Sequence, residues 1–317
     1  MSIASFLKLV EIQTKVASLI PFLFGSFYVY YRFETFSIVN ALILFISMII
    51  FDMTTTTINN YMDYKKAIKK EGYGYETHNA IVKDALQPGH VVILIIIMLV
   101  LSSLLGIVLV MRTNLIILLL GMICFAIGIS YSFGPLPISR TPFGEVFSGL
   151  TMGFILTFIS MYVHIFNQDV VNLNLIASHL EMFINVSLIL SLIIITLPLV
   201  TGIANIMLAN NICDMDDDIV NRRYTLPICI GKENSLVLYF ALYVFGYCSI
   251  VLGVVLNVLP FVSLLTLLTI KPVVKHVKQF NQIQTKKDTF ILSVKNFIII
   301  NLVYIVTIIL AILLKFV

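Results

Sequence analysis

Long stretches without a charged residue dominate the pattern of the chain. There are eight of them, at residues 16–31, 35–51, 91–111, 113–139, 146–168, 182–213, 234–270 and 296–314. A bilayer core of about 30 Å is crossed by ~20 helical residues that are mostly apolar. The pattern therefore predicts membrane-spanning helices along almost the whole chain.

Two of these stretches are too long for a single span, and each contains a turn signal. Residues 234–270 include LNVLP, in which Asn257 and Pro260 suit a tight turn, so the stretch divides into two helices. In residues 113–139 the segment YSFGPLP ends the helix early. Nine transmembrane helices are predicted, near residues 16–32, 37–60, 91–111, 114–131, 145–166, 182–209, 235–256, 258–276 and 291–314.

The composition excludes a soluble domain. The 317 residues are 60% hydrophobic and only 11% charged, with a mean hydropathy of +1.04. A soluble protein needs a largely polar surface, whereas lipid solvates apolar side chains. The four cysteines lack CxxC spacing, which favours small buried thiols over a metal or redox motif. We expect an all-α integral membrane protein with one domain over residues 1–317.

Basic residues predict the orientation of these helices. All but three of the 20 Lys and Arg residues fall on the side of the N-terminus, and the exceptions are Arg32, Arg112 and Lys315. Because basic residues collect on the cytoplasmic side, the N-terminus is expected in the cytoplasm and the C-terminus outside the cell membrane. The long connections 61–90, 132–144, 210–233 and 277–290 are then cytoplasmic, and function is expected there.

The segment NNICDMDDDIVNRR, which begins at Asn210, carries four aspartates within five positions directly after an apolar stretch. Asn210, Asp214 and Asp218 are spaced by four residues, which places them on one face of a helix. Asp217 lies near that face, whereas Asp216 points elsewhere. Carboxylates this close repel one another unless a positive group lies among them. A solvated acidic loop is the alternative interpretation.

A second, shorter copy lies at the end of the second predicted helix, in TTTTINNYMDYKK. Asn59 and Asp63 are again four residues apart, and Asp52 and Thr56 extend the same face toward the bilayer. In proteins Mg²⁺ is commonly bound by one or two carboxylates together with substrate phosphates. A metal–diphosphate site therefore explains both acidic segments, whereas a solvated loop explains only one. Asp52 is either functional, because a charge at that depth is costly, or bonded to a neighbouring threonine.

Basic side chains on the same side of the membrane suit a diphosphate. Lys15, Arg140, Arg222 and Arg223 all belong to the predicted cytoplasmic face. Their charge-assisted hydrogen bonds would hold diphosphate oxygens. An ion-coupled secondary transporter is the competing class, but it predicts broken helices with charges near the middle of the bilayer. The acids of this chain lie at helix ends, which argues against a transporter.

Four motifs, taken in order, resemble the UbiA superfamily of intramembrane prenyltransferases. They are VEIQTKVASLIPFLFGS (10–26), NNYMDYKKA (59–67), YSFGPLPISRTPFGE (131–145) and NNICDMDDDIVNRRYTLP (210–227). The nine-helix layout agrees, and the resemblance covers nearly the whole chain. The loop motifs are most similar to the branch that prenylates 1,4-dihydroxy-2-naphthoate in menaquinone synthesis.

The resemblance implies a central cavity that opens to the cytoplasmic side and a defined set of site residues. Mg²⁺ would be held by Asn59, Asp63, Asp214 and Asp218. Tyr131, with Tyr61 and Tyr64, would shield an allylic cation from water; the alternative is that these tyrosines lie at the membrane border. The predicted substrate-binding residues are Lys15, Asn60, Arg140, Asn210 and Arg223. In the naphthoate branch Arg140 is a plausible partner for the acceptor's carboxylate and Glu145 for a hydroxyl.

The implied reaction transfers a polyprenyl group from an allylic diphosphate to an aromatic acceptor. With dihydroxynaphthoate the transfer is accompanied by loss of CO₂ and gives demethylmenaquinol, the reduced form of demethylmenaquinone; another aromatic or quinone precursor is the alternative acceptor. The expected partners are these two substrates and the lipid bilayer, with no nucleic acid. No protein partner can be inferred from the sequence.

The chain departs from the family pattern in the first acidic motif. Asn60 and Ala67 stand where the family usually has aspartate, and Glu71, Glu76 or Asp84 are candidates to compensate. Tyr224 replaces the second residue of a basic pair that follows the other acidic motif. These departures concern the number of bound Mg²⁺ ions. His78 is either a ligand or a solvated loop residue.

Overall fold

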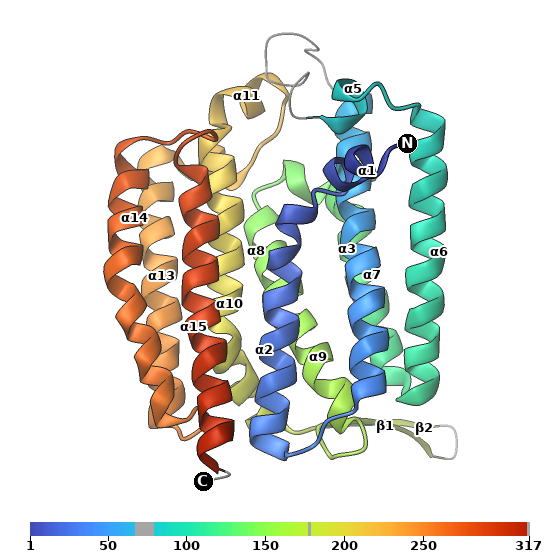
Figure 1. Cartoon of the computed structure of the whole chain (residues 1–317), viewed down its shortest axis with the longest axis vertical. Coiled ribbons are helices and arrows are strands. Elements are labelled where there is room, and N and C mark those ends of the chain that lie inside the picture. The colour runs from blue at the N-terminus through green and yellow to red at the C-terminus, as the bar shows by residue number, and fades with distance from the viewer. Residues whose placement is uncertain (67–78, 177–178, 316–317) are drawn as a thin grey trace.

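The computed structural model describes residues 1–66, 79–176 and 179–315. Eight of its helical segments are long and apolar enough to cross a membrane. They contain α2 (Val16–Phe33), α3 (Ile38–Lys66), α6 (Pro88–Arg112), α7 (Leu115–Ser132), α9 (Leu156–Ile165), α10 (Val186–Cys213), α13 (Lys232–Val255) and α15 (Phe290–Lys315). Figure 1 shows these helices running side by side along the longest axis of the molecule. The predicted helical membrane fold is confirmed.

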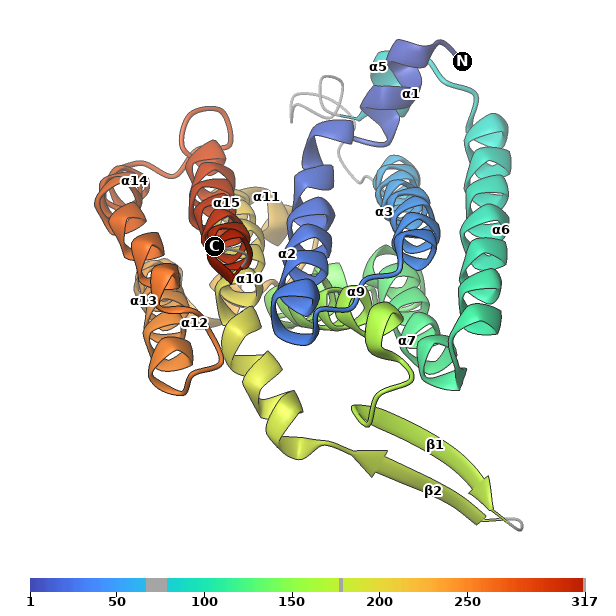
Figure 2. The same cartoon turned by 60° about the horizontal axis from the view of Figure 1, so that its bottom comes forward.

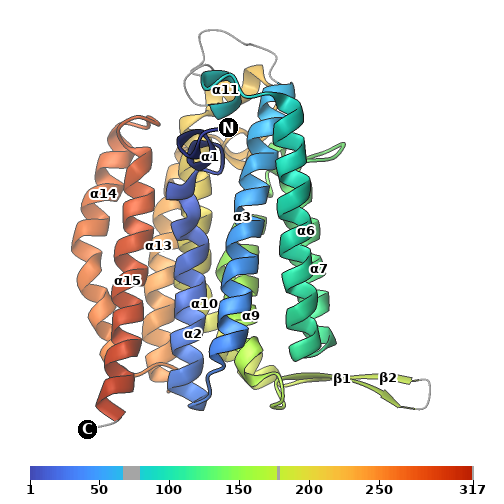
Figure 3. The same cartoon turned by 45° about the vertical axis from the view of Figure 1, so that its right-hand side comes forward.

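The remaining predicted span, 258–276, falls on a segment that changes its helix type. A 3₁₀ segment, η4 (Phe261–Thr269), continues directly into α14 (Ile270–Gln282). At about 2.0 Å per residue for 3₁₀ and 1.5 Å for α, the pair extends roughly 37 Å, which exceeds a bilayer core. Figures 1 and 3 place α14 beside α13 and α15. The count of nine spans stays a prediction.

The turn before η4 agrees with the sequence. Helix α13 ends at Val255, Asn257 adopts a left-handed backbone with φ of 55°, and Pro260 precedes η4. Asparagine tolerates this conformation better than most residues, and Pro260, whose ring fixes φ, is itself extended just before η4 begins. The division of residues 234–270 at this point is confirmed.

Close helix contacts hold the bundle together around a large apolar core. Helix α10 packs against α13, α15 and the π-helical segment η3 (Gly149–Ile155), while α3 packs against α6 and α2 against α9. Gly153 allows the η3–α10 contact, because a Cβ at that position would lie 2.5 Å from the Cα of Val200. The predicted span 145–166 is therefore a composite of α8 (Gly144–Ser148), η3 and α9.

A β-hairpin interrupts the helical architecture between α9 and α10. Strands β1 (Val171–Ile176) and β2 (His179–Ile184) pair antiparallel, with Val171 opposite Ile184. Figures 2 and 3 show the hairpin projecting sideways from the bundle. The predicted start of the next helix at residue 182 is wrong, because residues 179–184 form the second strand. The helix begins at Val186 instead.

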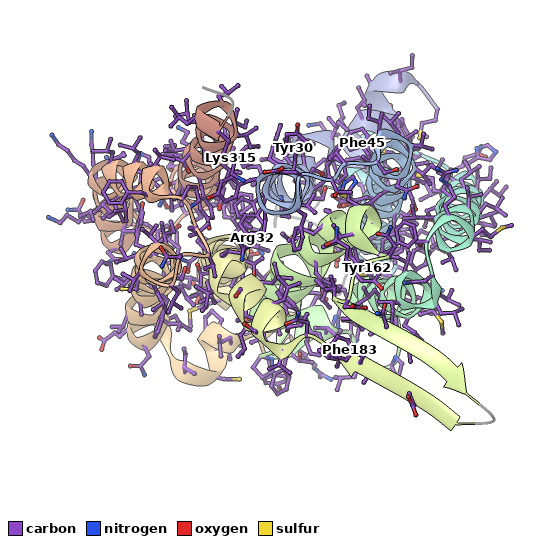
Figure 4. All side chains as sticks on the ribbon, turned by 90° about the horizontal axis from the view of Figure 1, so that it is seen from below. Tyr30, Arg32, Phe45, Tyr162, Phe183 and Lys315 are labelled. Carbon is purple, nitrogen blue, oxygen red and sulfur yellow. The ribbon has the colours of Figure 1, made fainter. Side chains whose placement is uncertain are left out.

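The two ends of the bundle differ. Figure 1 places the N-terminus, α1 (Ile3–Leu9), α5 (Ala80–Lys83) and α11 (Met215–Val220) at one end, and the C-terminus with the hairpin at the other. Figure 4 views the second end and labels Arg32 and Lys315, two of the three basic residues predicted outside. The termini therefore lie at opposite ends, as an odd number of spans requires. Which end faces the cytoplasm stays a prediction.

Candidate active site at one end of the bundle

A cavity of about 580 Å³ lies among α3, α6, α7 and the α8–η3–α9 segment. Apolar side chains form most of its wall, including Met48, Phe51, Ile117 and Phe125. Polar residues line it toward the end that carries the N-terminus, namely Thr14, Ser18, Asp52, Thr55, Thr56, Asn59, Tyr131 and Ser132. An apolar chain with a polar head group fits such a gradient.

Asp52, at the polar part of this wall, is neutralised by an ion pair. Lys15 Nζ lies 2.8 Å from Asp52 Oδ1 and donates to Thr56 Oγ1 at 2.6 Å. Ser18 Oγ donates to the second carboxylate oxygen at 2.6 Å. Lys15 is only 5% exposed, so its charge needs this partner. The Asp52 carboxylate therefore pairs with Lys15 and Ser18, whereas Thr55 and Thr56 donate to its backbone oxygen. A functional role of Asp52 and the role of Lys15 in substrate binding stay predictions.

One helical turn beyond the cavity, α3 presents its acidic end. Asn59 lines the cavity and accepts a hydrogen bond from Ser132 Oγ at 2.8 Å. Asp63 is exposed and lies within electrostatic range of Asp214, Arg140, Arg223 and Lys286. The ends of α3 and α10 therefore converge, although they are about 150 residues apart in the chain.

The second acidic segment keeps its helical spacing across the junction of α10 and α11. Asp214 ends α10, and its backbone N–H donates to Asn210 O at 3.1 Å. The N–H of Asp218 in turn donates to Asp214 O at 2.8 Å. These bonds span four residues each, so Asn210, Asp214 and Asp218 follow one helical path. The predicted common face is consistent with this path.

The carboxylates of Asp214 and Asp218 each have a cationic partner. Asp218 is 3% exposed, lies 3.2 Å from Arg223 Nε and accepts a hydrogen bond from Thr225 Oγ1 at 3.3 Å. Burial raises the pKa of Asp218 to about 6, against the lowering effect of Arg223. Asp214 forms an ion pair with Lys286, from the connection between α14 and α15.

The connection between α7 and α8 is hydrogen-bonded to Arg223 and Tyr224. Arg223 Nη2 donates to Ser139 O at 3.3 Å, and the N–H of Tyr224 donates to Arg140 O at 3.1 Å. These bonds attach the connection to the segment that follows α11. Arg140 and Arg223 are thereby brought to the acidic residues, as the sequence predicts for a diphosphate site.

Two further polar groups belong to this region, the half-buried Tyr131 and the buried Glu145, which interact electrostatically. Tyr131 lines the cavity and accepts a hydrogen bond from Ser148 Oγ at 3.2 Å. Glu145 is 3% exposed, and its Oε1 accepts from Asn211 Nδ2 at 2.8 Å. Its second oxygen, Oε2, has no hydrogen-bond partner in the described part of the chain. Asn211 was missed by the sequence analysis because it lies on a different face from Asn210.

Some predicted residues lie apart from this group. Asn60 is buried and donates to Leu9 O at 2.9 Å and to Glu11 Oε1 at 3.2 Å, so its side chain faces the N-terminal segment. Asp84 pairs with Lys8 at 3.1 Å. Arg222 is exposed and has a left-handed backbone. Ala67, Glu71, Glu76 and His78 lie outside the described residues.

The donor set suits a hard cation shared with a substrate. Within the described ranges, no three His, Cys, Asp or Glu side chains converge on one point. Asp63 and Asp214 nevertheless lie within electrostatic range of each other from two different helices. Oxygen donors in this arrangement fit Mg²⁺ ions that take one or two carboxylates each and complete their shells with phosphate oxygens.

Comparisons with known proteins identify the family of the chain. The model of the UbiA prenyltransferase family matches residues 18–312. The chain belongs to this family. The chain is 28% identical over 246 residues to the 1,4-dihydroxy-2-naphthoate octaprenyltransferase of Bacillus subtilis (strain 168), covering 75% of this chain and 70% of that protein.

Solved structures of family members share the fold. A UbiA homologue from Archaeoglobus fulgidus bound to DMAPP and Mg²⁺ has a TM-score of 0.67 at 14% identity, over 97% of this chain and 99% of that one. A UbiA homologue from Aeropyrum pernix K1 has a TM-score of 0.69 at 17% identity, over 93% and 98%. Such low identities establish the common fold alone.

Family membership settles the class of protein. The chain is a multi-pass membrane protein and a prenyltransferase. The UbiA resemblance drawn from the four motifs is confirmed. The transporter alternative is replaced by this assignment.

Proposed function

We propose that this UbiA-family protein transfers a polyprenyl group from an allylic diphosphate to 1,4-dihydroxy-2-naphthoate, with loss of CO₂. The observation that carries the proposal is the convergence of α3, α10 and the α7–α8 connection at the polar end of an apolar cavity. The B. subtilis relative, named a 1,4-dihydroxy-2-naphthoate octaprenyltransferase, supports this choice of acceptor.

The acidic residues act on the diphosphate end of the donor. Asn59, Asp63, Asp214 and Asp218 would hold Mg²⁺, and a bound Mg²⁺ supplies Lewis-acid neutralisation of the charge that develops on the leaving diphosphate. Asp63 and Asp214 belong to separate helices and lie within electrostatic range of each other. A diphosphate bound between them would be held from both helices.

Arginine side chains complete the diphosphate site. Arg223, anchored between Asp218 and Ser139 O, presents donors beside the carboxylates, and Arg140 lies within electrostatic range of Asp63. Hydrogen bonds from a guanidinium to phosphate oxygens strengthen as charge builds up on the leaving group. Their effect is greater where protein excludes water.

The apolar cavity would hold the prenyl tail and keep water from the allylic carbon. Tyr131 lies at its polar end, where an allylic cation would form, and its ring would stabilise that cation through cation–π contact. The ring carbon that bears the acceptor's carboxylate then forms a bond to the allylic carbon as the C–O bond breaks, and the electron pair of its C–CO₂⁻ bond returns to the ring. The electron pair of that C–O bond leaves with the diphosphate, and the ring recovers its aromatic character by loss of CO₂.

A panel of acceptors tests the proposal. Purified protein with Mg²⁺ and a polyprenyl diphosphate is incubated separately with dihydroxynaphthoate, 4-hydroxybenzoate and homogentisate, and products are identified by mass. We expect a prenylated, decarboxylated naphthoquinol from the first acceptor alone. Turnover of 4-hydroxybenzoate or homogentisate in its place contradicts the proposed acceptor.

A further inference from the structure

Lys286 lies at the acidic residues although neither acidic motif contains it. It belongs to the connection between α14 and α15, and its Nζ forms an ion pair with Asp214 Oδ2. The Lys286 side chain is 48% exposed, while that of Asp214 is 14% exposed. The ammonium group therefore reaches from the solvent side onto a largely covered carboxylate.

The field of Lys286 extends to all three carboxylates assigned to Mg²⁺. Besides its ion pair with Asp214, Lys286 interacts electrostatically with Asp63 on α3 and with Asp218 on α11. These acids come from two distant parts of the chain, and the diphosphate is expected between them. Because Lys286 interacts with the acids of both parts, it lies near the position expected for the diphosphate.

The backbone of the connection holds Lys286 in place. The N–H of Thr285 donates to Thr289 Oγ1 at 2.9 Å, and the N–H of Asp288 donates to Thr285 Oγ1 at 3.2 Å. The N–H of Phe290 closes the turn by donating to Thr285 O at 3.0 Å. Lys286 thus projects from a hydrogen-bonded turn whose two ends are tied to each other.

We propose that Lys286 is a diphosphate-binding residue, which pairs with Asp214 in the free protein and with diphosphate oxygens in the substrate complex. This inference rests on the proposed function. When Asp214 holds Mg²⁺, its negative charge is no longer available to Lys286, and the metal repels the ammonium group. Phosphate oxygens beside it then become its partners. Lys286 acts through its charge and its hydrogen bonds and takes part in no covalent step.

Binding of inorganic diphosphate to the purified full-length protein in Mg²⁺ tests this role without any acceptor. Loss of a charge-assisted hydrogen bond predicts that Lys286→Met weakens diphosphate binding by roughly tenfold to a hundredfold in calorimetry. Lys286→Arg keeps the charge and is expected to retain most of the affinity. Lys287→Met is the matched control, because Lys287 is exposed and makes no ion pair with any described residue.

Two results would overturn the inference. Lys286→Met binding diphosphate like the wild type would leave the residue without this role, whether or not Mg²⁺ alone then binds more tightly. A wild-type protein that binds no diphosphate in Mg²⁺ would remove the site altogether.

If the wild type binds diphosphate through Lys286 but does not prenylate dihydroxynaphthoate, the acceptor proposal fails and the role of Lys286 stands. If Lys286→Met does not fold, Lys286→Gln replaces it in the same measurement.

Discussion

In the free protein, each predicted metal-binding carboxylate lies near basic side chains. Asp218 pairs with Arg223 and Asp214 with Lys286, while Asp63 lies in the field of several cations. With a pKa of about 6, Asp218 is mostly ionised at neutral pH despite its burial. Burial raises the pKa of Asp63, while Arg223, Arg140 and Lys286 lower it. The basic residues that stabilise the ionised acids also suit a diphosphate.

Loss of the carboxylate from either acidic segment, at Asp63 or at Asp214, is expected to stop catalysis. Asp63→Ala and Asp214→Ala should each lower Mg²⁺-dependent prenyl transfer by at least about 100-fold, because charge on the leaving group loses its stabilisation. The assay uses membranes and a labelled prenyl diphosphate. Asp216→Ala, at an exposed position, is the control and should keep wild-type activity. Wild-type rates in both alanine variants would rule out the assigned site.

The ion pair of Lys15 with Asp52 makes a separate prediction about stability. Asp52→Asn leaves a nearly buried ammonium group without its counter-ion, at an expected cost of about 3 kcal/mol. The thermal midpoint of the detergent-solubilised protein should fall accordingly. The double variant Lys15→Met with Asp52→Asn removes the unpaired charge and should recover most of the loss. An unchanged midpoint in the single variant would show that the pair is not stabilising.

At the scale of elements, the sequence predicts the long helices well and their interruptions poorly. Charge-free stretches and the LNVLP turn locate the helices, because burial in lipid depends on composition and turns on local chemistry. The π-helical segment η3 has no such signal, since its sequence GLTMGFI contains neither a charged residue nor a proline. The hairpin does have one: VNLNL alternates apolar and polar residues with the period of a strand.

In the candidate site too, the sequence predicts the local features and misses those that depend on helix packing. Asn and Asp residues four positions apart predict the acidic helix faces from local sequence alone. Lys286 and the Glu145–Asn211 pair join residues that are 72 and 66 positions apart, so only the packed helices reveal them. The orientation of Asn60 toward the N-terminal segment is likewise a tertiary effect.

The contact between η3 and α10 gives a prediction at this scale. Gly153→Ala places a methyl group 2.5 Å from the Cα of Val200, and backbone cannot move aside as a flexible side chain can. Overpacking of this kind should destabilise the protein by about 2 kcal/mol, measured as a lower thermal midpoint. Gly89→Ala is the control, because an added Cβ there meets nothing within 4 Å. Equal midpoints for the two variants would contradict this packing.

Over the whole molecule, the candidate site lies at one end of the bundle, called the active end below, and the hairpin lies at the other. The end with the N-terminus carries the acidic residues and their basic partners, whereas Arg32, Arg112 and Lys315 lie toward the opposite end. Lys315 Nζ there donates to Tyr31 O at 2.7 Å and pairs with Glu34 at 3.3 Å. The charge distribution predicts that the active end faces the cytoplasm.

Labelling of single cysteines tests this orientation. In a background without the exposed Cys229 and Cys248, a membrane-impermeant thiol reagent applied to intact cells should modify Asn167→Cys. Lys287→Cys, at the other end, should react only after the cells are opened. The reverse pattern would place the active end outside.

The central claim is a prenyl transfer coupled to decarboxylation, and the ratio of its two products tests it most directly. Purified protein receives Mg²⁺, a polyprenyl diphosphate and dihydroxynaphthoate that carries an isotopic label in its carboxyl group. We predict that labelled CO₂ and prenylated naphthoquinol form in equal amounts, and that neither forms without Mg²⁺. A prenylated product that keeps the labelled carboxyl group, or no product from folded protein, would contradict the account.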